Sequence, residues 1–332
     1  MEIRQVNIAD INAGVVGLGL MGSSIVCCLL VSGHRVKAIA PIHQDSIGAL
    51  VRIEEQLAVC RDAGLLSSSV ASCLSQLTIS EDYKELADCS FVLECVMEKI
   101  EIKKQVYEKI VEHVTPQTII ASNTSALPIG ALQKLVAHPE RFLGIHWAEP
   151  AYMTRFLEIT CGEQTDPFYA AWVFELAHQW RKEPTLLKKD IRGFITNRLM
   201  YALYREALQL AEKGDATIED IDKALKYDFG SWITLMGIFR RMDFTGLKDF
   251  EKIFHNSFPA LSNRDDVPLL MQQMVDSGAR GVKNLRGLYQ YTAHEGVQWS
   301  EAFALFNRDI YRLAELYPAE ALKKSRLSKS MV

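Results

Sequence analysis

Apolar and polar positions follow two different patterns along this chain. In the first half, short apolar runs alternate with longer segments whose apolar members recur at helical spacing. Apolar strands or runs are expected over 13–17, 36–39, 91–95 and 118–121, and helices over 20–31, 47–63 and 99–114. Because strands that alternate with helices pair in parallel, this half predicts an α/β domain with a doubly wound sheet.

The second half follows a helical pattern with few strand signals. Residues 194–213 show a long helical pattern, and Thr217 followed by Asp220 is typical of the cap of a helix over 218–225. The charged segment 188–192 interrupts the apolar pattern between the two halves. The expected domains are an α/β domain over 1–188 and an all-α C-terminal domain over 189–332.

Composition and charge indicate a globular protein that binds neither nucleic acid nor a membrane surface. The chain has 332 residues, of which 48% are hydrophobic and 23% charged, as in ordinary globular proteins of two domains. Its net charge of −4 gives no basis for binding nucleic acid or anionic lipid. The odd number of cysteines, seven, and the lack of a CxxC pair predict reduced thiols and no metal site. Without a secretory signal or an uninterrupted apolar span at the start, we expect a cytoplasmic protein.

A glycine-rich turn lies between the first predicted strand and the first predicted helix. Residues 17–22 read Gly-Leu-Gly-Leu-Met-Gly. In such a turn the first glycine permits the tight bend, the second lets the backbone approach a pyrophosphate, and the third allows close packing of helix on strand. The motif predicts a Rossmann-type dinucleotide site, with these cofactor-binding residues: Gly17, Gly19, Leu20, Met21 and Gly22.

One part of this fingerprint is missing. The second predicted strand is normally followed by an acidic residue that binds the ribose 2′-hydroxyl. Here Ala40 stands at that position, and no arginine replaces the acid to bind a 2′-phosphate. NAD is therefore the expected cofactor, and NADP remains the alternative.

A histidine and an acid further along the chain predict the chemistry. Oxidation of a secondary alcohol needs a base for the hydroxyl proton, and histidine suits that task near neutral pH. His146 ends an apolar strand, and the next apolar strand, 156–160, carries one acid, Glu158. A carboxylate beside the imidazole would orient the ring. Taken alone, a histidine in this pattern is more often a buried structural residue than a catalytic base.

Several motifs together give the chain a family resemblance. They are Gly17–Gly22, Ala121–Ser125, Gly144–His146 with Glu158, Arg192–Arg198, Glu212–Thr217 and Gly281–Tyr289. In this order and spacing they resemble the 3-hydroxyacyl-CoA dehydrogenase family over most of the chain. The resemblance implies an oxidoreductase of fatty acid metabolism that oxidises a 3-hydroxyacyl-CoA to the 3-ketoacyl-CoA with NAD.

The resemblance also implies roles for individual residues. His146 corresponds to the catalytic base and Glu158 to its partner, while Ser125 and Asn197 correspond to residues that hydrogen-bond the substrate. Without the motifs, Ser125 would be interpreted as a turn residue and Asn197 as a helix-start residue.

Three further residues match family positions that contact the cofactor. These are Glu98, Lys103 and Lys283. The alternative places Glu98 and Lys103 on the solvated face of an amphipathic helix, and Lys283 on a surface loop.

Two features leave the substrate open. Glu149-Pro150 stands where the family has an Asn-Pro pair, and few basic residues are available for the phosphates of coenzyme A. The first alternative substrate is therefore a small free hydroxy acid, as in gulonate or carnitine dehydrogenases, with Tyr152 and Arg155 as possible contacts. The second alternative is a catalytically silent nucleotide-binding scaffold.

The resemblance finally implies a homodimer formed through the helical domain. Met236, Ile238 and Phe239 are candidates for its interface. Because an interface and a core share the same composition, the alternative is that these residues lie in the core.

Overall fold

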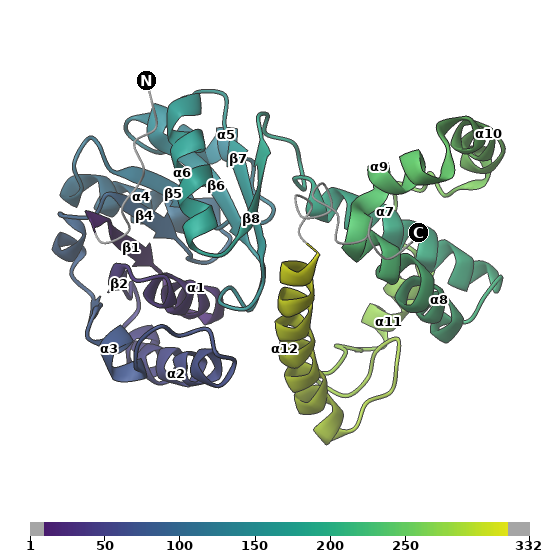
Figure 1. Ribbon diagram of the computed structural model, residues 1–332, viewed down its shortest axis with the longest axis horizontal. Helices are drawn as coiled ribbons and strands as arrows, with labels where there is room; N and C mark the ends of the chain where they lie inside the picture. Colours follow the sequence, from purple (N-terminus) through teal and green to yellow (C-terminus); the bar gives the residue numbers. More distant parts are fainter. Residues whose placement is uncertain (1–9, 318–332) are drawn as a thin grey trace, which may run out of the picture. The chain divides into compact units, whose positions relative to one another are not determined.

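The computed structural model of the protein describes residues 10–317 (Figure 1). The chain divides into two compact units that meet between Asn197 and Arg198. The first, which we call the sheet unit, contains all the strands described below, and the second, the helical unit, consists of helices and loops. Among the described helices, none has the length and the apolar character needed to cross a membrane.

One mixed sheet forms the centre of the sheet unit. Its strands are β1 (Asn12–Val16), β2 (Arg35–Ile39), β3 (Leu77–Ser80), β4 (Phe91–Glu94), β5 (Ile119–Ser122), β6 (Phe142–Trp147), β7 (Phe156–Cys161) and β8 (Glu183–Leu187). They lie in the order β3-β2-β1-β4-β5-β6-β7-β8. This confirms the predicted Rossmann-like sheet. Only β6 and β7 pair antiparallel among the described neighbours, because the loop between them is too short for a crossover helix.

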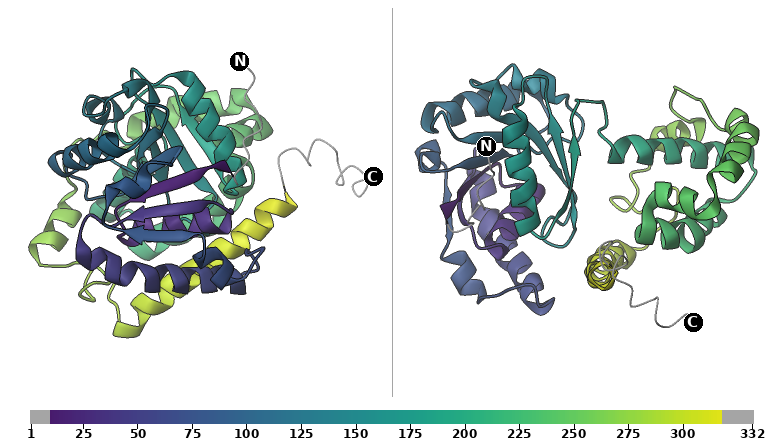
Figure 2. Two further views of the ribbon diagram at one scale, coloured as in Figure 1. Left: turned by 90° about the vertical axis from the view of Figure 1, so that its left-hand side faces the viewer. Right: turned by 45° about the horizontal axis from the view of Figure 1, so that its top comes forward.

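Helices cover both faces of the sheet (Figure 2). They are α1 (Leu20–Val31), α2 (His43–Asp62), α3 (Val70–Leu74), α4 (Ile100–His113), α5 (Ile129–Gln133) and α6 (Pro167–Gln179). Successive side chains of a strand point to opposite faces, so β1 contributes Val15 to one buried cluster and Val16 to the other. The near-continuous apolar strands follow from this burial on both faces.

The helical unit begins within α7 (Thr196–Lys213). Its other helices are α8 (Ile218–Ala224), α9 (Gly230–Thr245), α10 (Leu247–Ser257), α11 (Leu269–Asp276) and α12 (Ala293–Leu316). The predicted cap is confirmed, because the Thr217 hydroxyl accepts a hydrogen bond from Asp220 N at 3.1 Å. The helix expected from residue 194 begins at Thr196, since Phe194 has a φ of +50°, outside the helical region.

The two units differ in their cores. All the buried apolar side chains of the described residues lie between Ile11 and Phe194, in the sheet unit. In the helical unit, large apolar side chains such as Phe239 (76% exposed) and Phe244 face outward. Met236 and Ile238, which the sequence places with Phe239, are half-buried.

Candidate active site

The glycine-rich turn lies at the carboxyl end of β1, where it joins α1. Gly17 has a φ of +99°, and its N–H donates to Ile39 O at 2.8 Å. A Cβ on Gly17 would lie 2.8 Å from the backbone of Cys95, and a Cβ on Gly22 would lie 1.8 Å from Gly17 O. Both positions therefore require glycine. The place of a Cβ on Gly19 is open, with no neighbouring atom within 4 Å, which leaves room for a ligand to approach the backbone.

The start of α1 fits the pyrophosphate of NAD. No side chain caps this helix and its first turn holds no acidic residue, so its N–H groups are available to an anion. Arg52 of α2 donates to Leu18 O at 2.6 Å and so supports the turn. Ala40 follows β2 and is fully buried. It stands where an acidic residue would normally bind the ribose 2′-hydroxyl. The sequence shows Arg52 as one of few basic residues after the second strand, but its contact with the turn depends on the packing of α2 on α1.

His146 and Glu158 are direct partners across β6 and β7. His146 Nδ1 lies 3.4 Å from Glu158 Oε2, and their side chains are 14% and 0% exposed. The other oxygen of Glu158 accepts from the backbone N–H groups of Ile195 and Thr196, the first at 2.8 Å. A carboxylate held this way acts as an acceptor, so the proton of the neutral imidazole lies on Nδ1 and Nε2 keeps its lone pair. The imidazole is thus arranged to accept a proton at Nε2.

Neighbouring residues fix the position of this ring. The His146 ring lies 5.4 Å from Phe156 in an edge-to-face contact and 5.9 Å from Phe194. Trp147 N donates to Asn123 Oδ1 at 3.1 Å, which ties the end of β6 to the loop after β5. The carboxyl ends of the parallel strands β1, β4, β5 and β6 lie at one edge of the sheet. His146 and the glycine-rich turn therefore share that edge.

The structure brings Ser125 and Asn197 together. Asn197 Nδ2 donates to Ser125 O at 3.1 Å, and Ser125 lies on the exposed loop after β5. Thr124, which sequence analysis had not singled out from its motif, accepts from Leu127 N at 2.9 Å and so closes this loop. A hydroxyl and an amide are thus presented near one another.

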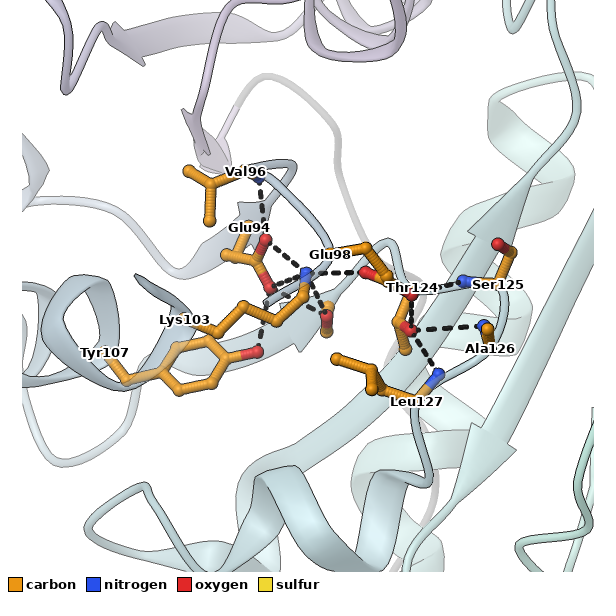
Figure 3. Close-up of polar contacts among 10 residues, drawn as sticks. Glu94, Val96, Glu98, Lys103, Tyr107, Thr124, Ser125, Ala126 and Leu127 are labelled. Atoms are coloured by element: carbon orange, nitrogen blue, oxygen red, sulfur yellow. Dashed lines mark hydrogen bonds and ion pairs between the residues drawn. The ribbon is translucent and has the colours of Figure 1, made fainter. Parts of the chain in front are cut away.

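Glu98 and Lys103 occupy different environments (Figure 3). The Glu98 carboxylate is partly exposed. It accepts hydrogen bonds from the Thr124 hydroxyl and from Ser125 N, the second at 3.3 Å. Burial alone would raise the pKa of Glu98, but the bond from Thr124 and the charge of Lys103 lower it overall. Lys103 is only 1% exposed and contacts Glu94 and Glu98, so it does not lie on the solvated face of α4. Their contact with the cofactor stays a prediction.

The loop that follows His146 is held from two sides. Ala151 N donates to Ser24 Oγ of α1 at 2.7 Å. The ammonium of Lys182 donates hydrogen bonds to the carbonyl oxygens of Ala151 and Thr154, and burial lowers the pKa of this ammonium. Glu149 precedes this segment, is exposed, and is joined to Pro150 by a cis peptide bond. Sequence analysis missed Lys182, because a lysine at the start of a strand is usually solvated.

The remaining candidate residues have separate environments. Tyr152 packs against the apolar core, and burial raises the pKa of its hydroxyl. Arg155 forms an ion pair with Glu183 at the start of β8. Lys283 lies on an exposed turn of the helical unit, so its approach to the nucleotide stays a prediction.

Family models match both units of the chain. The model described as 3-hydroxyacyl-CoA dehydrogenase, NAD binding domain, matches residues 12–191. The model described as 3-hydroxyacyl-CoA dehydrogenase, C-terminal domain, matches residues 193–291.

Individual relatives are similar over most of their length. The 5-formyl-3-hydroxy-2-methylpyridine 4-carboxylate 5-dehydrogenase of Mesorhizobium japonicum is 31% identical over 287 residues, which are 86% of this chain and 92% of that protein. The crystal structure of a dehydrogenase of that name, an NAD+ dependent dismutase, matches with a TM-score of 0.85 at 30% identity, covering 92% of this chain and 98% of that one. (S)-3-hydroxybutyryl-CoA dehydrogenase from Ralstonia eutropha matches with a TM-score of 0.71 at 27% identity, covering 85% and 99%.

Proposed function

The chain belongs to the 3-hydroxyacyl-CoA dehydrogenase family, and from this premise we propose that it oxidises its substrate with His146 as the general base. The family assignment makes it an NAD-dependent dehydrogenase that acts on CH–OH donors. The pairing of His146 with Glu158 carries the proposal, because it leaves Nε2 free to accept a proton at the edge of the sheet that also holds the glycine-rich turn.

Each polar residue has a distinct task in this proposal. NAD, when bound, supplies the acceptor for the hydride that leaves the carbinol carbon. The hydroxyl proton passes to Nε2 of His146, and the buried Glu158 stabilises the imidazolium that forms. Ser125 and Asn197 hold the substrate oxygen, so that it faces the imidazole.

For the substrate, we propose a small molecule without a CoA thioester as the first candidate. The structural match to the pyridine carboxylate dehydrogenase extends over more of this chain, and with a higher TM-score, than the match to the hydroxybutyryl-CoA dehydrogenase. A 3-hydroxyacyl-CoA is the second candidate, favoured by the family models of both units, and it would give the enzyme a role in fatty acid metabolism.

Turnover measured at the NADH absorbance band separates these candidates. The substrates to be assayed are acetoacetyl-CoA, small oxo acids, and aldehydes that carry a carboxylate on an aromatic ring. Each is assayed with NADH or NAD, and in parallel with NADPH or NADP. Turnover of a small compound but not of the thioester supports the first candidate; the reverse supports the second.

We expect His146→Ala to lower kcat/KM by about 10²- to 10⁴-fold while NADH still binds. The matched control is His178→Ala, an exposed histidine of α6, which should retain activity. Full activity of His146→Ala would refute its role.

We further propose that a second copy of the chain covers the outward-facing apolar residues of the helical unit. Helices in proteins draw most of their stability from packing of an apolar face, and large exposed apolar patches mark interaction sites. Phe239, Phe244 and Trp299 are each more than half exposed. Light scattering should show a dimer, and Phe239→Ser should weaken it. Phe168→Ser, at a less exposed phenylalanine of α6, is the matched control. A monomeric wild-type chain would refute the proposal.

A further inference from the structure

A buried charged cluster lies beneath the Ser125 loop and has no part in the proposed proton transfer. Glu94 ends β4 and is fully buried, and its carboxylate accepts hydrogen bonds from four groups (Figure 3). These are Lys103 Nζ at 2.7 and 2.9 Å, Tyr107 Oη at 2.8 Å, Ser122 Oγ at 2.7 Å and Val96 N at 2.7 Å. The acceptor sites of this carboxylate are thus occupied by groups from β5, α4 and the loop after β4.

Such a cluster is better suited to fixing positions than to adding stability. Taking a carboxylate and an ammonium out of water costs several kcal/mol per ion, and apolar residues of similar volume often stabilise a core equally well. Burial raises the pKa of Tyr107, and the charge of Glu94 raises it further, so this hydroxyl stays a donor. The directional bonds around Glu94 therefore hold Lys103 in one place.

From Lys103 a chain of contacts leads to the Ser125 loop. Lys103 Nζ lies 3.1 Å from Glu98 Oε2, and the other oxygen of Glu98 accepts from the Thr124 hydroxyl and from Ser125 N. Thr124 in turn accepts from Leu127 N. In Figure 3 the Ser125 hydroxyl points away from these contacts, so they hold its backbone and leave the hydroxyl available.

We propose that Glu94 is a positioning residue for the substrate, which acts through Lys103 and Glu98 on the loop that presents Ser125. The proposal rests on the proposed role of Ser125. Glu94 itself is fully buried and does not reach the substrate. Its loss therefore changes the geometry of the Ser125 hydroxyl and leaves the pair of His146 and Glu158 in place, since that pair is held by β6 and β7.

A double-mutant cycle tests the coupling. We expect Glu94→Gln to lower kcat/KM on the order of 10- to 100-fold, because a small misplacement of a positioning group has effects of this size. In the Ser125→Ala background the same change should have an effect of less than about threefold, since the group it positions is gone. Tyr107→Phe should give the same pattern more weakly, and it keeps the test decisive if Glu94→Gln does not fold. Effects that simply multiply in the double variants would overturn the proposal.

A second measurement does not depend on turnover. The backbone N–H of Ser125 donates to Glu98, and that of Leu127 donates to Thr124. Hydrogen exchange at these two amides should become at least about tenfold faster in Glu94→Gln or Tyr107→Phe. Lys104→Gln changes an exposed lysine of the same helix and is the matched control. Faster exchange together with multiplicative kinetics would show that the loop responds while Ser125 lacks its proposed role. Unchanged exchange in both variants would overturn the positioning proposal itself.

Discussion

Two buried lysines lie in the sheet unit near the candidate active site, and the protein compensates their charges in different ways. Lys103 contacts the carboxylates of Glu94 and Glu98. Lys182 donates to the carbonyl oxygens of Ala151 and Thr154 and lies 5.3 Å from the ring of Trp147, and no carboxylate in the described part of the chain forms an ion pair with it.

The difference predicts different consequences when each lysine is removed. Removing Lys103 leaves a carboxylate that is fully buried without its counter-charge. Removing Lys182 leaves neutral carbonyl groups without donors, and at the same time removes a charge whose burial is unfavourable. The Lys103 cluster should therefore be the less tolerant of the two.

The largest effect is expected for Lys103→Met. Breaking a buried ion pair from one side costs about 3–5 kcal/mol of unfolding free energy, because the remaining charge stays uncompensated. Urea denaturation measures this loss. The matched control, Lys104→Met, removes an exposed lysine with a surface partner at 3.9 Å and should change stability by less than about 1 kcal/mol. A loss below about 1 kcal/mol in Lys103→Met would contradict the ion-pair interpretation.

A smaller effect is expected for Lys182→Met. Leaving buried carbonyl groups unsatisfied costs about 1–3 kcal/mol, and relief from burying the ammonium offsets part of it. The same urea titration gives the value, and Lys188→Met, an exposed lysine directly after β8, is the control. If Lys182→Met proved more destabilising than Lys103→Met, the comparison between the two lysines would be wrong.

The sequence carried much of the information on the fold and on the pairing of His146 with Glu158. The strand before Gly17 and the helix after the glycine-rich turn are visible as a local pattern, and the spacing of His146 and Glu158 follows from adjacent strands joined by a short loop. Because these signals depend on local periodicity and short loops, the sequence reveals them.

The environments of the two lysines could not be predicted in this way. Lys103 lies on an amphipathic helix, and its burial depends on how α4 packs against the end of β4. Lys182 contacts a loop 28 to 31 residues away, which β8 approaches only through its pairing with β7. Long-range packing of this kind overrides the usual preference of lysine for solvent.

The same comparison extends to pH, with a smaller effect. Burial lowers the pKa of Lys182 in the folded protein below its usual 10.5. At pH values between the lowered pKa and 10.5, Lys182 is therefore protonated in the unfolded chain and deprotonated in the folded protein. The unfolding free energy then rises with pH in this interval, by at most about 1.4 kcal/mol per pH unit for one group.

At the Lys103 cluster, Glu98 has the opposite pH range, because its pKa is lowered in the folded protein. The stabilisation that the Glu98 carboxylate contributes is fully present above its usual pKa of 4.5, and it is lost as the pH falls through the lowered pKa.

Unfolding free energies of the wild type, Lys182→Met and Glu98→Gln, measured from about pH 3 to about pH 10, separate the two contributions. The difference between wild type and Lys182→Met should grow in favour of the wild type only on the alkaline side, because the variant has no proton to release there. The difference between wild type and Glu98→Gln should shrink only on the acid side, as the carboxylate becomes protonated and loses its bond from Thr124 and its contact with Lys103. Parallel curves for Lys182→Met and wild type up to pH 10 would mean that the ammonium is as stable in the fold as in water, and that its carbonyl partners compensate its charge as fully as carboxylates do.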